Sequence, residues 1–500
     1  MARYSYTDVI DGLCNSSGNT WLPYDQVKTF INRNHGSMSD INSLINEGTL
    51  KLAQKNSQLF ITLQRYYQAE IDIVNNVFRI MKAPHSQYSD TELDRLIDRI
   101  EQKKNAKLHV NQREAVKKGV NNSFLVLTGG PGTGKTFVLN FINDVIRALM
   151  PDTRIDYAAP TGKAARRITE STGFYATTLH SKLRISVDHM EPTPLSKDIR
   201  VMTIDEISML DIWMMLALMQ AVQTGTKLIL VGDTDQLPSV GPGAILRDLI
   251  ASGVVPVAAL TATFRQAGDS DLFDNIQRIK SGNDHLVSGR DFKIAVPKAG
   301  LSAQEILLWM YKQEIKEWDG PENVMCLTPF RKNGDTCSNQ LNIKIQDYVN
   351  PTGATYRRKD GVCLRKGDLV MQQENRERVA NGDIGVVTDV YPGTGVSVKF
   401  YDCVKDYGSA NISDITLSYA MSIHKSQGSE AKSVVTLLLN EHKQMLQRNL
   451  LYTAVTRAKK KCSLLCEPEA VTKAVQTEAS SLRVTMLKEL LQYKATGKYE

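Results

Sequence analysis

The stretch Gly129-Gly-Pro-Gly-Thr-Gly-Lys-Thr136 decides the fold class of this chain. It matches the pattern G-x-x-x-x-G-K-[ST] in full, and it lies between an apolar strand predicted over 124–128 and a helix predicted over 137–149. In that setting backbone N–H groups and the positive end of the helix hold phosphates, Lys135 adds charge at the β- and γ-phosphates, and Thr136 ligates Mg²⁺. A merely glycine-rich turn is the alternative, but it explains neither the Lys-Thr pair nor the flanking elements.

Two neighbouring carboxylates follow a second predicted strand, which ends in Asp205 and Glu206. Asp205 is suited to hold Mg²⁺ through water, and Glu206 is suited to polarise an attacking water, which favours hydrolysis over transfer to another substrate. A further strand predicted over 227–231 leads into 232–243, where Gln236 is suited to sense a γ-phosphate; a plain βα loop is the alternative there. Together with the P-loop, these residues predict Mg²⁺-dependent hydrolysis of a nucleoside triphosphate.

The composition is that of a globular protein of about three domains. The 500 residues are 42% hydrophobic and 23% charged, and Lys+Arg 61 against Asp+Glu 54 leaves a formal net charge of +7. These values argue against a largely disordered, collagen-like or coiled-coil chain. Apolar runs such as 254–260 are shorter than the roughly 20 residues that cross a bilayer, and the first residues lack the pattern of a signal peptide. Seven scattered cysteines without a Cys-x-x-Cys pair argue against a zinc site. We therefore expect a cytoplasmic protein without a membrane partner.

The two ends of the chain carry helical patterns. Residues 1–105 are expected to form a helical N-terminal domain, with helices over 41–45, 59–81 and 90–104. The tail over 481–500 has apolar residues on one helical face, which predicts a helix that caps the last domain; binding to a partner is the alternative.

The rest of the chain is organised as strand–turn–helix units. These units predict a first parallel sheet within 106–260 and a second within 261–500, which makes the fold class α/β. The stretch 382–400 differs, because it has the pattern of two short strands joined by a Pro-Gly turn. It predicts a small β-barrel inserted in the second α/β domain, at about 376–416.

Taken together, the motifs resemble those of superfamily 1 helicases, and within that superfamily the RecD-like branch. In chain order the matching segments are 111–112, 129–136, 159–165, 177–180, 205–209, 232–243, 263–266, 419–430 and 451–458. The segments that resemble the RecD-like branch in particular are 59–81, 330–332, 366–375 and 381–385. The resemblance covers about residues 106 to 470.

The resemblance implies two RecA-like motor domains with ATP bound between them. It implies that Arg265 and Arg457 reach across the cleft to the γ-phosphate, as arginine fingers do; a surface ion pair is the alternative for each. The residues that it assigns to ATP are Gln112 at the adenine, Gly130, Gly132, Thr133, Gly134, Lys135 and Thr136 at the phosphates, and Glu430 at the ribose. The catalytic residues implied are Lys135, Glu206, Gln236, Arg265 and Arg457, and the Mg²⁺ ligands are Thr136 and Asp205.

The resemblance also implies a path for single-stranded DNA across both domains. The residues assigned to DNA are Pro160, Thr161, Lys163, Thr178 and His180 in the first domain and Ser422, His424, Lys425 and Gln427 in the second. Hydroxyl, amide and lysine groups suit phosphate and sugar contacts, which position a strand without reading its sequence. The two histidines suit stacking or backbone contacts, with a satisfied core histidine as the alternative. In RecD-like proteins a strand-separating pin stands where 184–196 lies here, and the insertion at 376–416 resembles their SH3-like module; an ordinary loop is the alternative for 184–196.

The expected function is therefore that of an ATP-dependent DNA helicase. By resemblance it moves 5′ to 3′ on single-stranded DNA, acts at duplex junctions as a monomer, and works in a bacterial or phage-infected cell. A translocase that remodels DNA without separating its strands and an RNA helicase are the alternatives. Replication, repair and recombination are all compatible with the sequence.

Overall fold

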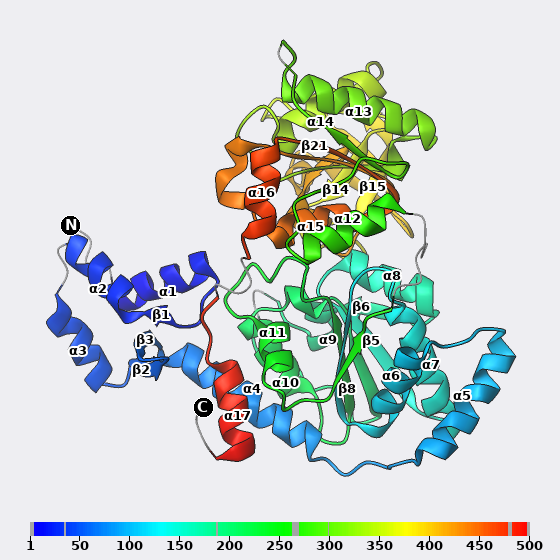
Figure 1. Ribbon diagram of the computed structural model, residues 1–500. Coiled ribbons are helices and arrows are strands. Elements are labelled where there is room, and N and C mark those ends of the chain that lie inside the picture. Colours follow the sequence, from blue (N-terminus) through cyan, green and yellow to red (C-terminus); the bar gives the residue numbers. More distant parts are fainter. Residues whose placement is uncertain are drawn as a thin grey trace.

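The computed structural model describes residues 5–34, 37–186, 189–262, 270–298, 300–478 and 483–497. Two parallel sheets, each with helices on both faces, lie one above the other in Figure 1, and a smaller region with the first helices lies beside the lower sheet. The fold is the predicted α/β arrangement of two RecA-like domains preceded by a largely helical region. Among the described residues, no helix has both the length and the apolar character needed to cross a membrane.

The N-terminal region is helical but also contains a small sheet that the sequence patterns did not predict. Its elements are α1 (Tyr6–Ser17), β1 (Leu22–Pro23), α2 (Tyr24–Arg33), α3 (Met38–Asn46), β2 (Leu50–Lys55), β3 (Gln58–Leu63) and α4 (Gln64–Met81). The three strands form an antiparallel sheet of order β1-β3-β2. Asn56 and Ser57 join β2 to β3 with φ of 48° and 62°, the positive values that a tight two-residue hairpin turn requires. The helix predicted from 59 therefore begins only at Gln64.

The first sheet carries the P-loop. Its strands are β4 (Phe124–Gly129), β5 (Arg154–Ala159), β6 (Ala176–Thr178), β7 (Ile199–Ile204), β8 (Lys227–Gly232) and β9 (Val257–Leu260), in the order β6-β5-β7-β8-β4-β9. Every neighbouring pair is parallel, so all carboxyl ends meet at one edge. Because β8 lies between β7 and β4, the loop 233–243 that follows β8 lies between the acid pair and the P-loop.

Helices bury both faces of this sheet. One face is covered by α5 (Asp90–Lys104), α6 (Val110–Asn121), α7 (Lys135–Leu149) and α8 (Gly162–Thr172). The other face is covered by α9 (Leu179–Leu183), α10 (Ile212–Ala221) and α11 (Ile245–Ala251), and α4 of the N-terminal region packs on α10. Successive residues of β4 alternate between the two cores, as the two-residue period of a strand dictates. The short 3₁₀ helix η1 (Ile207–Met209) follows the acid pair.

The second sheet is also parallel. Its strands are β10 (Phe292–Ala295), β11 (Val324–Thr328), β19 (Ala420–Ser422), β20 (Ala431–Leu438) and β21 (Ala458–Cys466), in the order β10-β21-β20-β11-β19. One face is covered by α12 (Asp271–Lys280), α15 (Arg448–Thr456) and α16 (Pro468–Gln476), and the other by α13 (Ala303–Glu317) and α14 (Ser338–Val349). The 3₁₀ helices are η2 (Pro321–Asn323), η3 (Ile412–Asp414), η4 (Ile423–Ser426) and η5 (Asn440–Met445).

An antiparallel sheet is inserted in this second domain. Its strands are β14 (Leu369–Gln372), β15 (Ile384–Tyr391), β16 (Gly395–Lys399), β17 (Val404–Gly408) and β18 (Ile415–Leu417), preceded by the pair β12 (Thr355–Arg357) and β13 (Cys363–Arg365). The predicted hairpin is confirmed, because β15 pairs with β16 around Gly393, whose φ is 74°. The strand order is β17-β16-β15-β14-β18, so the sheet begins before 376 and its edge strands are β17 and β18. The SH3-like assignment stays a prediction.

The tail does not cap the second domain, so that expectation is wrong. Its helix, α17 (Leu487–Thr496), packs against α4 and α11, and Figure 1 shows it in red beside the blue α4. Met486, Leu487, Leu490 and Leu491 are buried there. The apolar face correctly predicted a buried helix, but such a face does not identify the surface that buries it.

The described part of 184–196 contains no assigned strand. Ser186 and His189 exchange backbone hydrogen bonds of 2.8 and 3.2 Å. The Thr193 N–H donates to the Leu183 carbonyl at 2.8 Å. These backbone hydrogen bonds hold the described part of the segment close to α9, and its action as a pin stays a prediction.

Candidate nucleotide and DNA site

The lysine of the P-loop forms hydrogen bonds with backbone oxygens of the same loop. Gly132 and Gly134 have φ of 75° and 82°, values that residues with a Cβ rarely adopt. The Lys135 Nζ atom lies 2.6 Å from the Gly129 oxygen and 3.2 Å from the Gly130 oxygen. Phosphate oxygens can replace these carbonyl oxygens as acceptors, so Lys135 stands where a triphosphate is expected. Thr136 follows in the first turn of α7.

Gln112 supports the P-loop from behind. Its Oε1 accepts a hydrogen bond from the His109 N–H at 3.0 Å and completes the N-terminal cap of α6. Its Nε2 donates to the Thr133 carbonyl at 3.1 Å. The buried side chain thus ties α6 to the P-loop, while its contact with adenine stays a prediction.

The acid pair is buried at the end of β7. The Asp205 Oδ1 atom accepts a hydrogen bond from the Glu206 N–H at 2.8 Å. Burial, followed by the charge of Glu206, raises the pKa of the Asp205 carboxyl. Glu206 itself has φ 57° and ψ 40°, a left-handed conformation that costs energy for any residue except glycine. This conformation ends β7, so that both carboxyl groups stand at one strand end.

Arg167 of α8 forms ion pairs with both acids, contacts that sequence reasoning missed. Its Nη2 lies 3.4 Å from Glu206 Oε1 and 3.7 Å from Asp205 Oδ2. Its Nη1 lies 3.3 Å from Oε1 of Glu430, which also pairs with Lys459 of the second domain. Arg167 therefore links the acid pair of the first domain to the residue predicted at the ribose. The sequence did hold a signal for Arg167. It lies one helical turn after Lys163, which belongs to a motif assigned to DNA.

Helix α15 of the second domain is bonded to loop 233–243. The Tyr452 hydroxyl donates to Asp233 Oδ2 at 3.0 Å, and the Leu237 N–H donates to Thr453 Oγ1 at 2.9 Å. Asn449 Nδ2 also donates to the backbone oxygens of Asp235 and Gln236, at 2.9 and 3.1 Å. The loop beside the P-loop is thus held by both domains.

Two predicted residues lie buried at this boundary. Gln427 donates from Nε2 to the Leu237 carbonyl at 3.0 Å, and its contact with DNA stays a prediction. Gln236 is buried, and among the described residues no donor reaches its Oε1 atom. A buried acceptor without a donor is costly, so this oxygen marks a place for a water or a ligand.

Arg457 is a buried cation without a carboxylate partner among the described residues. Its guanidinium donates to the Thr453 carbonyl at 3.1 Å, to the Ser429 carbonyl at 3.3 Å and to Thr456 Oγ1 at 3.4 Å. Burial lowers its pKa, and the charges of Glu206 and Glu430 act on it from a greater distance. Such a group is poised for an anion. Arg265 lies outside the described residues.

The first-domain residues assigned to DNA stand at helix starts. Thr161 Oγ1 accepts from the Ala164 N–H and caps α8, and Thr178 Oγ1 accepts from the Ser181 N–H and caps α9, both at 3.2 Å. Pro160 is half-buried before the first cap, and His180 is exposed after the second. The side chains of both threonines therefore cap helices, and their contacts with DNA stay a prediction.

A cluster of three cations lies on the expected path of single-stranded DNA between the domains. This cation cluster consists of Lys163, Lys425 and Arg331. Lys163 Nζ is buried without a hydrogen-bond partner, and burial lowers the pKa of this amine to about 8. Lys425 Nζ and Arg331 Nη2 both donate to Gln373 Oε1, the latter at 3.2 Å. An amide oxygen held by two cations occupies the kind of position that a phosphate oxygen takes. Ser422 and His424 are half-buried nearby in sequence, at the start of η4.

Sequence reasoning did not assign roles to Arg331 and Gln373. The signal was present, because both lie in segments that resemble the RecD-like branch, 330–332 and 366–375. Their contact depends on the inserted sheet, which places Gln373 directly after β14.

The inserted sheet and its loops contact α8 of the first domain. A Cβ added at Gly162 would lie 2.4 Å from the Ala380 Cβ, so the two backbones approach as closely as glycine allows. Arg166 Nη2 lies 3.4 Å from Asp383 Oδ2, and its guanidinium stands 4.9 Å from the centre of the Tyr401 ring. A cleft of about 340 Å³ remains between α8 and the second domain; its polar lining includes Lys163, Arg166, Arg167, Glu322, Glu430 and Lys459.

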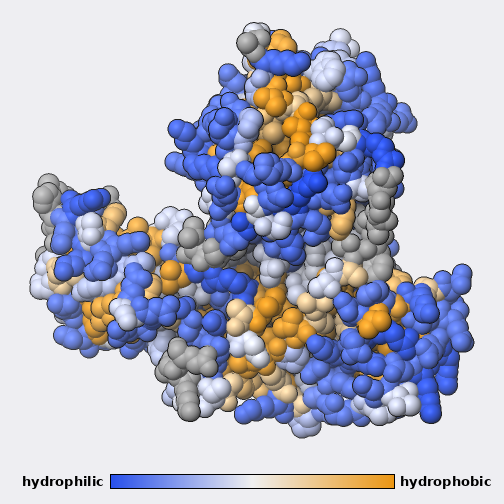
Figure 2. Space-filling model, viewed as in Figure 1, coloured by the Kyte–Doolittle hydropathy of each residue, from blue (hydrophilic) through white to orange (hydrophobic). Residues whose placement is uncertain are grey.

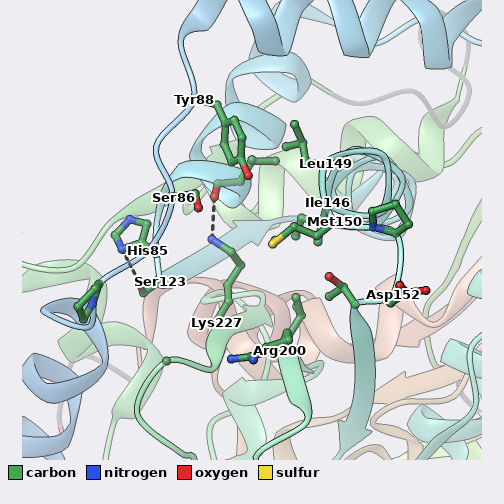
Figure 3. A pocket seen from close by; sticks show the side chains of 16 residues that line it. His85, Ser86, Tyr88, Ser123, Ile146, Leu149, Met150, Asp152, Arg200 and Lys227 are labelled. Carbon is green, nitrogen blue, oxygen red and sulfur yellow. Dashed lines mark hydrogen bonds between the residues drawn. The ribbon is translucent and has the colours of Figure 1, made fainter.

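A separate cavity of about 530 Å³ lies at the opposite edge of the first sheet (Figure 3). Lys227, at the start of β8, points into it and donates to the Val120 carbonyl at 2.8 Å, and burial lowers the pKa of its amine to about 7. Because Lys227 begins the strand that ends at loop 233–243, this cavity is a strand length away from the nucleotide site. Among the described residues, no group of three or more His, Cys, Asp or Glu side chains is arranged to hold a metal ion.

Comparisons with known proteins match both sheets. Residues 107–291 match the protein family described as AAA domain, and residues 417–465 match the family described as UvrD-like helicase C-terminal domain. The chain is 34% identical over 342 residues to the ATP-dependent RecD2 DNA helicase of Deinococcus radiodurans, which covers 67% of this chain and 46% of that protein. It is 31% identical over 433 residues to the RecBCD enzyme subunit RecD of Mycolicibacterium smegmatis, which covers 76% of this chain and 74% of that protein.

A crystal structure of Pif1 helicase from Bacteroides in complex with ADP-AlF3 and ssDNA aligns with 78% of this chain and 98% of its own. The sequence identity is 17% and the TM-score is 0.46. The chain spans about half the length of the RecD2 relative and about three quarters of the RecD relative.

Proposed function

This chain belongs to the RecD-like branch of superfamily 1 helicases, and on that premise we propose that it is an ATP-dependent DNA helicase. In this proposal it hydrolyses ATP between its two RecA-like domains, moves 5′ to 3′ on single-stranded DNA and unwinds duplex DNA at junctions. We also propose that it acts as a monomer in the cytoplasm of a bacterial or phage-infected cell. The RecD relatives are named as subunits of a RecBCD enzyme.

The observation that carries the proposal is the bonding of α15 to loop 233–243. The loop belongs to the first domain and stands between the P-loop and the acid pair, whereas α15 belongs to the second. A movement of this loop in response to the γ-phosphate can therefore pass directly to the second domain through these hydrogen bonds. Since Arg457 stands one residue beyond α15 as a buried cation without a carboxylate partner among the described residues, the same helix can bring positive charge to the phosphate when the domains close.

The residues present fit a Mg²⁺ ion bound with ATP. Magnesium prefers oxygen ligands and keeps phosphate oxygens and waters in its shell, so the Thr136 hydroxyl and the Asp205 carboxylate suffice from the protein. Asp205 is buried beside a second carboxylate, a charge pair that calls for a cation. When bound, the ion would neutralise phosphate charge.

Glu206, Gln236 and Arg167 have separate roles in the proposed hydrolysis. Glu206 is suited to orient and polarise the attacking water, and the free Oε1 of Gln236 is suited to accept a hydrogen bond from that water. Arg167 pairs with both acids and is suited to place positive charge beside the phosphates. Hydrolysis rather than group transfer is favoured, because the Glu206 carboxylate and the Gln236 amide are both suited to hydrogen-bond a water at this position.

The cation cluster between the domains supports a DNA backbone contact. Lys163 comes from the first domain, whereas Lys425 and Arg331 come from the second. A strand that bridges them would be gripped by both domains at once, and domain movement would shift one grip relative to the other. Contacts of this kind bind phosphate without reading base sequence.

The test is an ATPase and unwinding assay on the full chain with Lys135→Ala. We expect single-stranded DNA to stimulate the wild-type ATPase and a duplex with a 5′ tail to be unwound. Lys135→Ala should lose about a hundredfold or more in hydrolysis, because a charge at the transferring phosphate is removed. Lys316→Ala, an exposed lysine of α13, is the matched control and should keep both activities.

The alternatives give different results in the same assay. An ATPase that ignores single-stranded DNA would contradict the proposal. Stimulation without strand separation on either 5′-tailed or 3′-tailed duplexes would indicate a translocase, and stronger stimulation by RNA would indicate an RNA helicase. Deletion of 184–196 should lower unwinding and spare the ATPase if that segment is the pin.

A further inference from the structure

The two ends of the chain meet beside loop 233–243. The Val484 carbonyl accepts hydrogen bonds from the N–H groups of Thr20 at 3.0 Å and Trp21 at 3.2 Å, and the Val484 N–H donates to Asn19 Oδ1 at 2.8 Å. Figure 1 shows this C-terminal segment, residues 483–497, in red against the N-terminal region and the first domain. It follows α16 in sequence and therefore returns from the second domain to the first.

Arg483 reaches from this segment into loop 233–243. Its Nη1 donates to Ser239 Oγ at 3.0 Å, to the Gly241 carbonyl at 3.0 Å and to the Gly243 carbonyl at 2.7 Å. Its Nη2 donates to the Ser239 carbonyl at 2.5 Å. One guanidinium thus gathers three residues of the loop through a planar fork that lysine does not have.

The guanidinium sits in a socket built by three segments. A Cβ added at Gly18 would lie 2.5 Å from it, and the Gly243 N–H donates to the Gly18 carbonyl at 2.9 Å. No carboxylate among the described residues pairs with Arg483, and burial lowers its pKa to about 10. A half-buried cation that binds only neutral loop oxygens serves the shape of the loop rather than a surface ion pair.

The C-terminal segment is anchored without Arg483. Thr485 Oγ1 donates to Asp248 Oδ2 at 2.7 Å, and the Met486 N–H donates to Glu70 Oε1 at 3.2 Å. Lys55 Nζ lies 2.7 Å from Glu489 Oε1. With these contacts and the buried face of α17, removal of the Arg483 side chain leaves the segment in place and releases the loop alone.

The same loop is held at its other end by the second domain. The backbones of Gln236 and Leu237 form hydrogen bonds with α15. Leu237 lies two residues before Ser239, the first loop residue that Arg483 contacts. Between these ends, Val240 is 82% exposed and contributes no packing of its own. The position of Gln236 therefore depends on hydrogen bonds at both ends of the loop.

We propose that Arg483 is a positioning residue for ATP hydrolysis, which fixes loop 233–243 against the first domain so that movements at the nucleotide pass to the second. The inference rests on the proposed function, since it assigns to the C-terminal segment a part in the same ATPase. It also gives the N-terminal region, through Gly18, a direct contact with the loop that links the motor domains.

Arg483→Ala should lower kcat while leaving the KM for ATP unchanged. The P-loop, Gln112 and Glu430 remain intact, so nucleotide binding is preserved, but the loop holds Gln236 less well. We expect a fall of about five- to tenfold in DNA-stimulated kcat, the effect of losing hydrogen bonds from a charged group. Arg483→Lys, which keeps the charge and part of the hydrogen bonding, should recover part of this loss.

Ser239→Ala tests the contact from the loop side if the arginine variants fold poorly. Because Ser239 and Arg483 bond to each other, the double variant should lose less than the product of the two single losses. Lys494→Ala is the control, because Lys494 lies on the same C-terminal helix and contacts Asn75 of α4 instead of the loop. It should keep the wild-type kcat.

The outcomes separate this inference from the proposed function. A wild-type chain without DNA-stimulated ATPase would contradict the proposed function itself. With an active wild type, an unchanged kcat in Arg483→Ala would overturn the inference. A parallel loss of kcat, ATP binding and thermal stability that Arg483→Lys does not relieve would assign Arg483 a purely structural role and overturn it as well.

Discussion

At the scale of single residues, the buried carboxyl group of Glu70 ties the two ends of the chain together. Its Oε1 accepts hydrogen bonds from Thr20 Oγ1 at 2.6 Å and the Met486 N–H at 3.2 Å, and its Oε2 accepts from Trp21 Nε1 at 2.9 Å. Burial raises the pKa of this carboxyl from 4.5 to about 7, although each hydrogen bond acts in the opposite direction. Its ionisation therefore bears on stability near neutral pH.

The raised pKa predicts that the chain loses stability as the pH rises. The folded state holds this proton more tightly than the unfolded chain, so the contribution is complete below pH 4.5 and is lost as the pH rises through about 7. The loss amounts to about 3 kcal/mol. Glu70→Gln does not titrate, so its urea midpoint should fall less than that of the wild type between pH 5 and pH 8. Equal slopes for the two proteins would contradict the prediction, whatever the constant offset that the amide causes beside Trp21.

At the scale of elements, the inserted sheet and α8 form one wall of the expected DNA path. Their contact depends on Gly162 and Ala380, whose backbones leave no room for a further methyl group. Behind this contact lie Lys163 of α8 and Gln373 of the insertion, which belong to the cation cluster. The spacing of the two elements thus sets the spacing of the cations.

Gly162→Ala should weaken binding of single-stranded DNA. The new Cβ forces the insertion away from α8, because a packed contact of 2.4 Å between carbons cannot persist. We expect the Kd for an oligonucleotide to rise about fivefold or more by fluorescence anisotropy, while the ATPase without DNA stays near that of the wild type.

A compensating variant makes this test specific. Ala380→Gly removes the opposing methyl group, so the double variant should recover most of the affinity. Gly12→Ala, where a Cβ meets nothing within 4 Å, is the control and should bind like the wild type. A double variant that binds no better than Gly162→Ala would contradict the explanation.

At the scale of the whole molecule, several of the hydrogen bonds that join the described parts of the two motor domains converge on loop 233–243. Tyr452 is buried, its hydroxyl reaches Asp233 at 3.0 Å, and a Cβ at Gly130 of the P-loop would lie 3.2 Å from the same hydroxyl. The side chain of one residue thus touches two nucleotide loops of the other domain. Its removal should disturb communication rather than either fold.

Tyr452→Phe should lower the stimulation of the ATPase by DNA. The variant keeps the ring and loses one hydrogen bond to a buried carboxyl, which is worth about 1–3 kcal/mol. We expect the ratio of stimulated to basal kcat to fall several-fold. Tyr419→Phe is a matched control, because it loses a similar buried bond of 2.9 Å to Asp368 within the second domain. A similar ratio in both variants would contradict a specific role for Tyr452.

The sequence by itself determined the local chemistry of this protein. The P-loop, the strand before the acid pair, α5 and the β15–β16 hairpin could all be predicted, because each depends on contiguous residues whose period or turn chemistry is visible in the chain. The P-loop needs no distant partner to turn around a phosphate. By contrast, the hairpin of β2 and β3 was missed because its apolar residues continue without a break into α4.

Only the tertiary structure decided which distant residues meet. Arg167 and Glu430 are 263 residues apart, and Arg483 and Ser239 are 244 apart, so neither pair leaves a periodic signal. The apolar face of α17 predicted burial, yet α4 and α11 rather than the second domain receive it. Burial is non-directional, and many apolar surfaces can satisfy one amphipathic helix. The contacts of these loops and ends therefore depend on how the cores of the two sheets pack, which no contiguous stretch of sequence encodes.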